Sequence, residues 1–318
     1  MAEMIKDALT SSGSSSGRLS LPPDLAVIAA RELNETPQVR RQALVEFRRA
    51  LNEEEAHDEE DPTPDDDSIL LRFLRCKKFD VSRSLSVYNG YKAFRKNNKE
   101  LFNDLTPSRV SHIWDNGLLG ALESRDKHGR AVMVSFPGTW DPETQPLEDV
   151  LRAMILQLEH LIEDTMTQVT GIVLIADFKD FSLYQAKCIR PWFFQGMSAL
   201  VQNAFPARFK GVYILHQPWY ISLIMAVVSR LLTEKMNSRI HMLGDDLNEL
   251  SNDFNLDTLP EEFGGHGEPY NGHHWTDVMT SKENEGIAPN DEKDNKDSPS
   301  RIECTAPRPN KLRLETEI

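Results

Sequence analysis

The stretch Phe205-Pro-Ala-Arg208-Phe-Lys210-Gly-Val-Tyr-Ile-Leu215-His-Gln-Pro218-Trp-Tyr220 opens the part of this chain that decides its fold. No Asp, Glu, Lys or Arg lies between Lys210 and Arg230, a length close to the roughly 20 apolar residues of a membrane span. Pro218 argues against a span, because proline lacks the N–H that a helix interior needs but fits a helix's first turn. The stretch therefore predicts a strand over 212–215 and a helix that begins at Pro218.

The predicted helix has almost no polar face. Its apolar residues are Trp219, Tyr220, Ile221, Leu223, Ile224, Met225, Val227 and Val228. A helix that is apolar on all sides is either buried or set against another apolar medium. Both interpretations stay open, although the aromatic pair at its start favours a membrane interface, where amphipathic rings are enriched.

The composition is that of a globular protein whose charge is unevenly distributed. Of 318 residues, 39% are hydrophobic and 27% charged, and the net charge is −14. Residues 1–67 hold 16 acidic and 7 basic residues, residues 276–318 hold 10 and 7, and residues 68–275 hold 24 and 22. Acidic flanks disfavour nucleic acid, so any anion must be bound by a local group of basic residues.

The reactive residue types form no recognisable catalytic or metal site. Cys76, Cys188 and Cys304 have no paired spacing, which argues against disulfides and zinc. The histidines at 266, 273 and 274 match no helical ligand spacing, so we interpret them as a chance cluster. The chain has no GxSxG, GxxxxGK[ST], GxGxxG or HExxH motif. We therefore expect neither an enzyme nor a cofactor. No signal-peptide pattern opens the chain, and we expect a cytoplasmic protein.

The texture of the chain predicts two folded units between two disordered segments. Residues 1–17 form a Ser/Gly-rich leader that we expect to be disordered. Apolar spacings of three and four predict an all-helical unit over 18–105, interrupted by an acidic tract at 53–67. Asp67 and Ser68 resemble an N-cap for the helix that follows this tract. Residues 276–318 are poor in apolar side chains and predict a disordered acidic tail.

Residues 107–270 have the alternating pattern of an α/β domain. Strands are predicted at 118–122 and 131–136 as a hairpin, then at 171–176, 212–215 and 240–243. Helices are predicted at 147–162 and across 183–204. Strands that alternate with helices indicate a largely parallel mixed sheet with crossover helices.

Several short motifs, taken in order, resemble the CRAL-TRIO lipid-transfer family over 18–270. They are Leu70-Leu-Arg-Phe-Leu-Arg-Cys-Lys-Lys-Phe-Asp80, Gly171-Ile-Val-Leu-Ile-Ala-Asp177, Phe205-Pro-Ala-Arg-Phe-Lys-Gly211, Leu232-Thr-Glu-Lys235, Arg239-Ile-His-Met242 and Leu259-Pro-Glu-Glu-Phe-Gly-Gly265. Ala30-Arg-Glu-Leu-Asn34 and Gln217-Pro-Trp-Tyr220 are most similar to the clavesin and alpha-tocopherol-transfer-protein-like branch. Cys76 departs from the alanine usual in this family.

The resemblance implies a protein that encloses one hydrophobic ligand under a mobile helical gate. It also implies that four residues beside the gate, called here the basic quartet, bind a phosphoinositide bisphosphate headgroup: Arg208, Lys210, Lys235 and Arg239. Spacing supports convergence, because residues four apart share a helix face and residues two apart share a strand face. The alternative is four solvated surface charges.

For the enclosed ligand, periodicity suggests a set of pocket and gate residues. They are Phe136, Ile155, Leu158, Phe181, Phe194, Val201, Ile214, Trp219, Ile221, Ile224, Met225 and Val228. Arg72 and Arg75 are interpreted as ion-pairing residues that join the helical unit to the α/β domain, and Asp177 as a structural hydrogen-bond acceptor.

Two functions remain open. The first is a monomeric lipid-transfer protein that docks on phosphoinositide-containing membranes of endosomes or the trans-Golgi network. The second is a membrane-trafficking adaptor in which the lipid cavity is secondary and the acidic flanks recruit clathrin-coat proteins.

Overall fold

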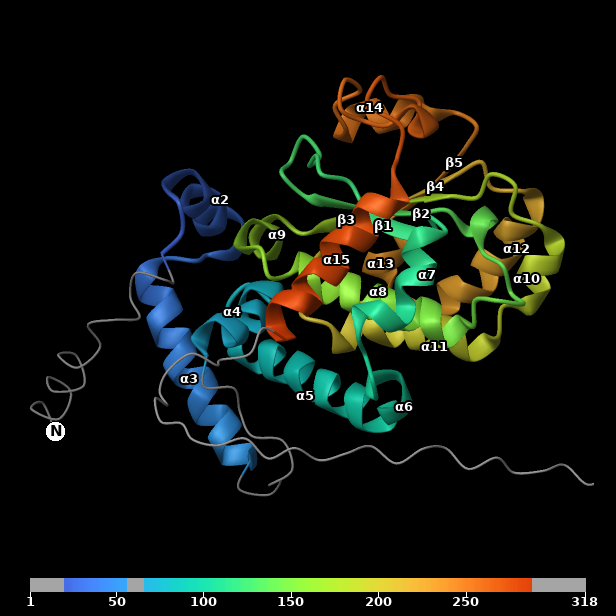
Figure 1. Cartoon of the computed structure of the whole chain (residues 1–318). Coiled ribbons are helices and arrows are strands. Elements are labelled where there is room, and N and C mark those ends of the chain that lie inside the picture. Colours follow the sequence, from blue (N-terminus) through green and yellow to red (C-terminus); the bar gives the residue numbers. More distant parts are fainter. Residues whose placement is uncertain (1–19, 56–65, 288–318) are drawn as a thin grey trace, which may run out of the picture.

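The computed structural model describes residues 20–55 and 66–287 (Figure 1). The predicted leader at 1–17, most of the acidic tract and residues 288–318 lie outside the described residues. At the edges of that tract, residues 53–55 still belong to a helix, and Asp67 already begins the next one.

The N-terminal unit is helical, as the periodicity predicted. Its elements are α2 (Pro23–Leu33), α3 (Pro37–Glu55), α4 (Asp67–Cys76), α5 (Val81–Asn97) and α6 (Lys99–Phe102). They pack around a core that includes Leu33, Phe47, Leu70 and Leu74. The N-cap prediction was wrong by one residue. Asp66 caps α4 by accepting from the Ser68 backbone at 2.8 Å, which leaves Asp67 to pair with Arg48 at 2.7 Å.

The second unit is the predicted mixed α/β domain. Its strands are β1 (Leu119–Ala121), β2 (Ala131–Ser135), β3 (Ile172–Asp177), β4 (Phe209–Leu215) and β5 (Ile240–Gly244). They lie in the order β1-β2-β3-β4-β5, with β1 antiparallel to β2 and each later neighbour parallel. β4 begins three residues before the predicted strand, because Phe209 already pairs with Ile172.

Helices connect and cover these strands. They are α7 (Pro107–Asp115), η1 (Pro137–Thr139), α8 (Leu147–Leu161), α9 (Thr165–Thr170), α10 (Leu183–Cys188), α11 (Pro191–Ala199), the π-helical turn η2 (Leu200–Ala204), α12 (Trp219–Val228), η3 (Ser229–Leu231), α13 (Glu234–Asn237), η4 (Leu247–Glu249), α14 (Leu250–Asp253), η5 (Glu261–Phe263) and α15 (Gly272–Ile287). Pro218 is the N-cap of α12, so the predicted start of that helix is confirmed to within one residue.

The two faces of the sheet carry different cores. One face packs against α7, α8, η2 and α15, in a cluster that includes Ile155, Leu158 and Ile172. The other face packs against the segment around α14 and η5, which Figure 1 shows on the far side of the sheet from α8 and α11. Alternation along β2 explains the division, because Met133 faces the first cluster and Val134 the second.

The predicted start of the disordered tail was wrong. α15 runs to Ile287, and Trp275 and Met279, four residues apart on one helix face, are buried in the first cluster. Glu283 accepts a hydrogen bond from the Ser108 backbone at 2.9 Å, which fastens this helix to α7. Val278 packs against the same cluster, so a few apolar side chains dock a helix whose composition is mostly polar.

Arg75 joins the two units. Its guanidinium is buried, pairs with Glu35 at 2.8 Å and donates to the Gln168 side chain of α9 at 2.6 Å. Arg72 lies 3.9 Å from Glu159 of α8. The structural role predicted for both arginines is confirmed.

Candidate functional site

A basic cleft of about 410 Å³ lies between the helical unit and the C-terminal part of the sheet. Among the described residues that line it, none is acidic and seven are basic: Lys77, Lys78, Arg83, Arg208, Lys210, Lys235 and Arg239. The whole basic quartet is therefore brought together in one concave site.

The local fold explains why these residues gather. Arg208 immediately precedes β4 and Arg239 immediately precedes β5, and because these strands are parallel their starting ends lie at the same edge of the sheet. Lys77 and Lys78 follow the end of α4. The end of α4 is brought to this edge by a contact in which the Cys76 thiol donates to the Ala207 carbonyl at 3.3 Å.

The helical argument for part of the quartet was wrong. α13 ends at Asn237, so Arg239 does not share a helix face with Lys235. The two still approach each other, because α13 leads within two residues into β5. Repulsion from Arg239, partial burial and the charges of Arg83, Lys78 and Lys77 lower the pKa of Lys235. A depressed lysine pKa of this origin marks a site with more positive than negative charge.

Arg208 and Lys210 have an internal partner. The Glu32 carboxylate, near the end of α2, accepts from Arg208 Nη2 at 3.2 Å and from Lys210 Nζ at 3.1 Å through the same oxygen, Oε2. Arg208 also donates to the Val169 carbonyl. Partial burial acts to raise the pKa of Glu32, but the hydrogen bond and charge of Lys210, together with Arg208, bring that pKa below its ordinary value.

Sequence reasoning missed Lys77, Lys78 and Arg83. Within the described residues, these three and Lys235 have neither an ion-pair partner nor a side-chain hydrogen-bond acceptor, so their positive charge is available to a ligand. The adjacent lysines stand inside the Leu70–Asp80 motif, which was a signal in the sequence. Nothing in the sequence linked that motif to residues more than 130 positions later.

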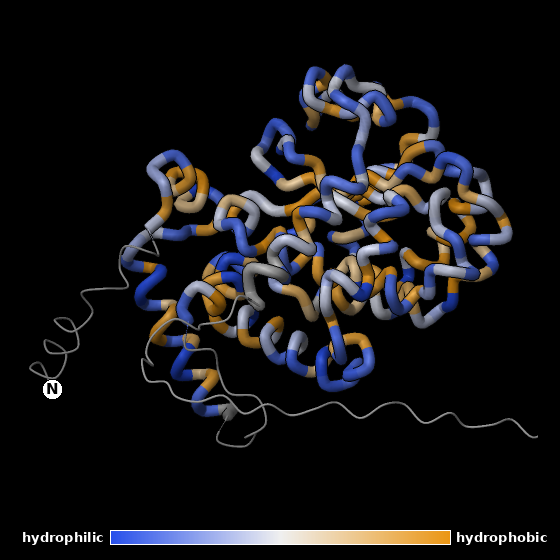
Figure 2. The backbone as a smooth tube through the Cα atoms, in the orientation of Figure 1, coloured by the Kyte–Doolittle hydropathy of each residue, from blue (hydrophilic) through white to orange (hydrophobic). Residues whose placement is uncertain are grey.

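α12 exposes one apolar face. Trp219, Leu223 and Val227 are 74%, 62% and 64% exposed, and their spacing of four places them on one face. Ile221 is only 3% exposed and packs into the core, with Ile224 and Met225 half-buried beside it. In Figure 2 the tube at the position of α12 is coloured as hydrophobic, on the side of the molecule away from the helical unit. Over the described residues, no helix is long and apolar enough to cross a membrane.

The end of α12 is tied to the basic cleft. Gln202, which lines the cleft, donates to the Leu231 carbonyl at 3.0 Å and accepts from the Thr233 backbone at 2.6 Å. Asn237 of α13 donates to the Ser229 carbonyl at 2.9 Å. The short connection between the exposed helix and the cleft is therefore held by side chains from both sides.

The predicted pocket residues do not all meet. Ile155, Leu158, Phe181 and Ile221 are buried in one cluster, with Ile224 and Met225 packed against them. Ile214 is buried in β4, and Phe194 and Val228 are half-buried. Val201 lines the basic cleft instead. Phe136 packs on the other face of the sheet, where it stacks on Phe263 and Tyr270, because it directly follows β2 and continues the alternation that places Val132 and Val134 on that face.

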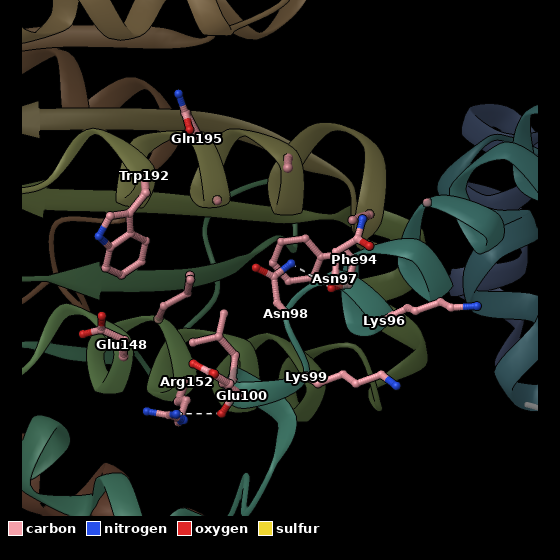
Figure 3. Close-up of a pocket in the computed structure, with 16 residues that line it drawn as sticks. Phe94, Lys96, Asn97, Asn98, Lys99, Glu100, Glu148, Arg152, Trp192 and Gln195 are labelled. Carbon is pink, nitrogen blue, oxygen red and sulfur yellow. Dashed lines mark hydrogen bonds between the residues drawn. The ribbon is translucent and has the colours of Figure 1, made fainter. Parts of the chain in front are cut away.

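A further pocket of about 790 Å³ lies between the helical unit and α8 and α11 (Figure 3). Trp192 and Gln195 of α11 line one wall, and Glu148 and Arg152 of α8 line another. None of the twelve predicted pocket residues lines it. Its floor includes Leu151 and Ala204, which belong to the same buried cluster as Ile155 and Ile221.

The remaining titratable candidates do not gather into one site. Asp177 accepts from the Lys179 backbone at 2.9 Å and lies 2.7 Å from His216 Nδ1, which agrees with its expected structural role. His266, His273 and His274 each lie beside a different carboxylate, those of Asp257, Asp115 and Glu123. Within the described residues, no three His, Cys, Asp or Glu side chains gather as metal ligands would.

Comparison with known proteins identifies the class of protein that this fold defines. The CRAL/TRIO domain matches residues 115–265. An alpha-tocopherol transfer protein-like protein of Mus musculus is 34% identical over 268 residues, covering 84% of this chain and 77% of that relative. Clavesin-1 of Rattus norvegicus is 34% identical over 267 residues (81% and 73%), and clavesin-2 of Homo sapiens 34% over 271 residues (83% and 80%).

The solved structure titled "Crystal structure of Sfh5" has the same fold, with a TM-score of 0.52 and 12% identity over 79% of this chain and 99% of that one. The chain belongs to the CRAL/TRIO family, on the side of the alpha-tocopherol transfer protein-like proteins and the clavesins.

Proposed function

We propose that this chain is a lipid-binding and lipid-transfer protein that recognises phosphoinositide bisphosphate headgroups on membranes, without catalysis. One observation carries the proposal: a cleft with seven basic side chains is connected, through η3 and α13, to a helix that exposes an apolar face. Polyvalent phosphate requires several convergent cationic donors, and an exposed apolar helix beside them can enter the acyl boundary of the same membrane.

Membership of the family supports the proposal that this chain binds a hydrophobic ligand. Relatives are named for alpha-tocopherol transfer, and here Ile155 and Leu158 of α8 and Ile221 of α12 belong to a single apolar cluster, against which Ile224 and Met225 pack. We place the ligand in this region, with α12 as its movable cover. A protein with these properties would work in the cytoplasm, at the surface of endosomal or trans-Golgi membranes.

The adaptor hypothesis has less support. It depends on acidic flanks that recruit coat proteins, and residues 1–19, 56–65 and 288–318 of those flanks lie outside the described residues. The observations of the cleft and of α12 concern a lipid surface, and we therefore prefer the transfer function.

The experiment is vesicle co-sedimentation with Lys77→Ala combined with Lys235→Ala. Neither lysine has a partner within the described protein, so their removal should leave the fold intact. We expect binding to vesicles of phosphatidylcholine with bisphosphorylated phosphoinositide to weaken by about 2 kcal/mol, or about 30-fold, since a charged hydrogen bond contributes about 1.5–3 kcal/mol before solvent screening.

Arg41→Ala with Lys96→Ala is the matched control, because it removes the same charge outside the cleft. Equal binding by the cleft variant, the control and the wild type would refute the headgroup site. Native mass spectrometry of the purified protein, which should show a co-purified hydrophobic molecule, tests the enclosed ligand separately.

A further inference from the structure

Two of the basic residues that line the cleft already bind an anion that the chain itself supplies. Glu32 Oε2 receives hydrogen bonds from Arg208 and Lys210 at 3.2 and 3.1 Å, from two donors that converge on a single oxygen. A phosphate oxygen in the place of Glu32 Oε2 would accept the same two hydrogen bonds, one from a guanidinium and one from an ammonium.

We propose that Glu32 is a competing internal anion, which a polyphosphorylated headgroup displaces when it binds Arg208 and Lys210 and which a singly charged anionic lipid does not displace. The proposal rests on the proposed headgroup function and adds a residue that sets its affinity. A ligand must displace the Glu32 carboxylate to reach Arg208 and Lys210, and the benefit of that exchange depends on the charge that the ligand brings.

The charges favour such a threshold. A headgroup with a single negative charge replaces one carboxylate by another anion of equal charge, so it gains little at Arg208 and Lys210. A phosphomonoester carries about −1.5 to −2 at neutral pH and offers three acceptor oxygens. A headgroup with two of them can exchange one phosphate for Glu32 while the other meets Lys77, Lys78 or Lys235, which have no acidic partner among the described residues.

Displacement requires only a side-chain movement. The backbone after Glu32 is held by the buried Glu35, which pairs with Arg75 and Arg40 at 2.8 Å each. Arg31 lies 3.9 Å from the other oxygen of Glu32 and is itself 72% exposed. The carboxylate therefore has an alternative cation on its solvent side, and α2 can remain docked while the cleft opens.

The experiment compares Glu32→Gln with wild type on three kinds of phosphatidylcholine vesicle. These contain phosphatidylserine, a monophosphorylated phosphoinositide or a bisphosphorylated phosphoinositide. Glutamine keeps the size of the side chain and removes its charge. We expect binding to the bisphosphorylated lipid to strengthen about 3- to 10-fold, because it no longer has to displace a charged carboxylate, and binding to phosphatidylserine to change less than about 2-fold, as befits a partly exposed ion pair. The monophosphorylated lipid should lie between them, and the ratio of bisphosphorylated-lipid binding to phosphatidylserine binding should therefore rise.

Glu46→Gln is the charge-matched control, since Glu46 is exposed on α3 and pairs only locally with Gln42 among the described contacts. Arg31→Ala keeps Glu32 but removes its alternative partner, and should raise the cost of displacement, weakening binding to the bisphosphorylated lipid about 2- to 3-fold. This second variant tests the idea with Glu32 intact.

The role of Glu32 would be overturned if Glu32→Gln left the ratio of binding between the lipids unchanged. If Lys77→Ala with Lys235→Ala still weakened binding in that case, the headgroup site itself would remain supported. If neither variant matters, the proposed function itself fails. Soluble inositol trisphosphate provides the remaining arm. Binding of this free headgroup without vesicle binding would overturn the assignment to a membrane lipid, whereas competition with vesicles supports it.

Discussion

α8 and α12 are apolar helices of the same domain, yet they use their apolar residues in opposite ways. Nine of the 15 residues of α8 are buried, whereas Ile221 is the one buried residue among the ten of α12. α12 is nevertheless the helix without a polar face. The hydrophobicity of a helix therefore does not measure its share of the core. The exposed apolar face of α12 is left uncovered by the described residues, and a large exposed apolar face usually marks an interaction surface.

Truncation of matched side chains should show the largest difference. We expect Ile155→Ala in α8 to lower the free energy of unfolding by about 2–5 kcal/mol, because it leaves a cavity in a packed cluster. Leu223→Ala in α12 should change it by less than about 0.5 kcal/mol, because Leu223 is 62% exposed. Urea unfolding of both variants measures this. Similar losses in the two would mean that the outer face of α12 is covered in solution.

The exposed face of α12 should matter for membranes instead. Leu223→Asp with Val227→Asp should weaken binding to phosphoinositide-containing vesicles by about 2 kcal/mol or more, because a buried leucine or valine contributes about 1.5–3 kcal/mol and a carboxylate opposes burial. Lipid transfer should fall with it, while the unfolding midpoint stays within a few degrees. Co-sedimentation and a fluorescent transfer assay measure the two effects.

Val45→Asp is the control for that experiment, since Val45 is 70% exposed on α3, in the helical unit. A comparable loss of vesicle binding in this variant would show that general charge, and not α12, governs the interaction. Ile221 is unsuitable for this purpose, although the sequence suggested it as a gate position. It is buried at the base of the helix, so a charge there would test folding.

Local pattern made the fold predictable. Proline at 218, the apolar run before Asp177 and the hairpin around Gly129 are signals contained within a few residues, and each element formed where its signal stood. The approach of Arg208 and Arg239 follows from the sheet, since parallel strands place the residues before them at one edge, whereas the quartet as a set came from the family resemblance. The docking of α15 was not, because Trp275 and Met279 are too few to give a periodic pattern.

The complete cleft could not be predicted for a different reason. Glu32 meets Arg208 and Lys210 across 176 and 178 residues of sequence. Lys77 reaches the same cleft only because Arg75 and Cys76 dock the end of α4 against the α/β domain. Such contacts depend on how the two units pack, and no local spacing carries that information.

The smallest expected effect concerns the hydrogen bonds that hold the end of α12. Their loss should make α12, but not α8, open more often. Gln202→Leu removes the hydrogen bonds to Leu231 and Thr233 that hold the chain after α12. Each such bond contributes about 1 kcal/mol net, and water can replace part of it because Thr233 is exposed. We therefore expect amide hydrogen exchange in α12 to accelerate about 5-fold, with α8 unchanged.

Because Gln202 also lines the basic cleft, a bound headgroup should reverse part of this acceleration or extend it, depending on whether it prefers the closed or the open helix. Equal acceleration in α8 and α12 would show that α12 opens only when the whole domain unfolds, and α12 could then not serve as a movable cover for the ligand.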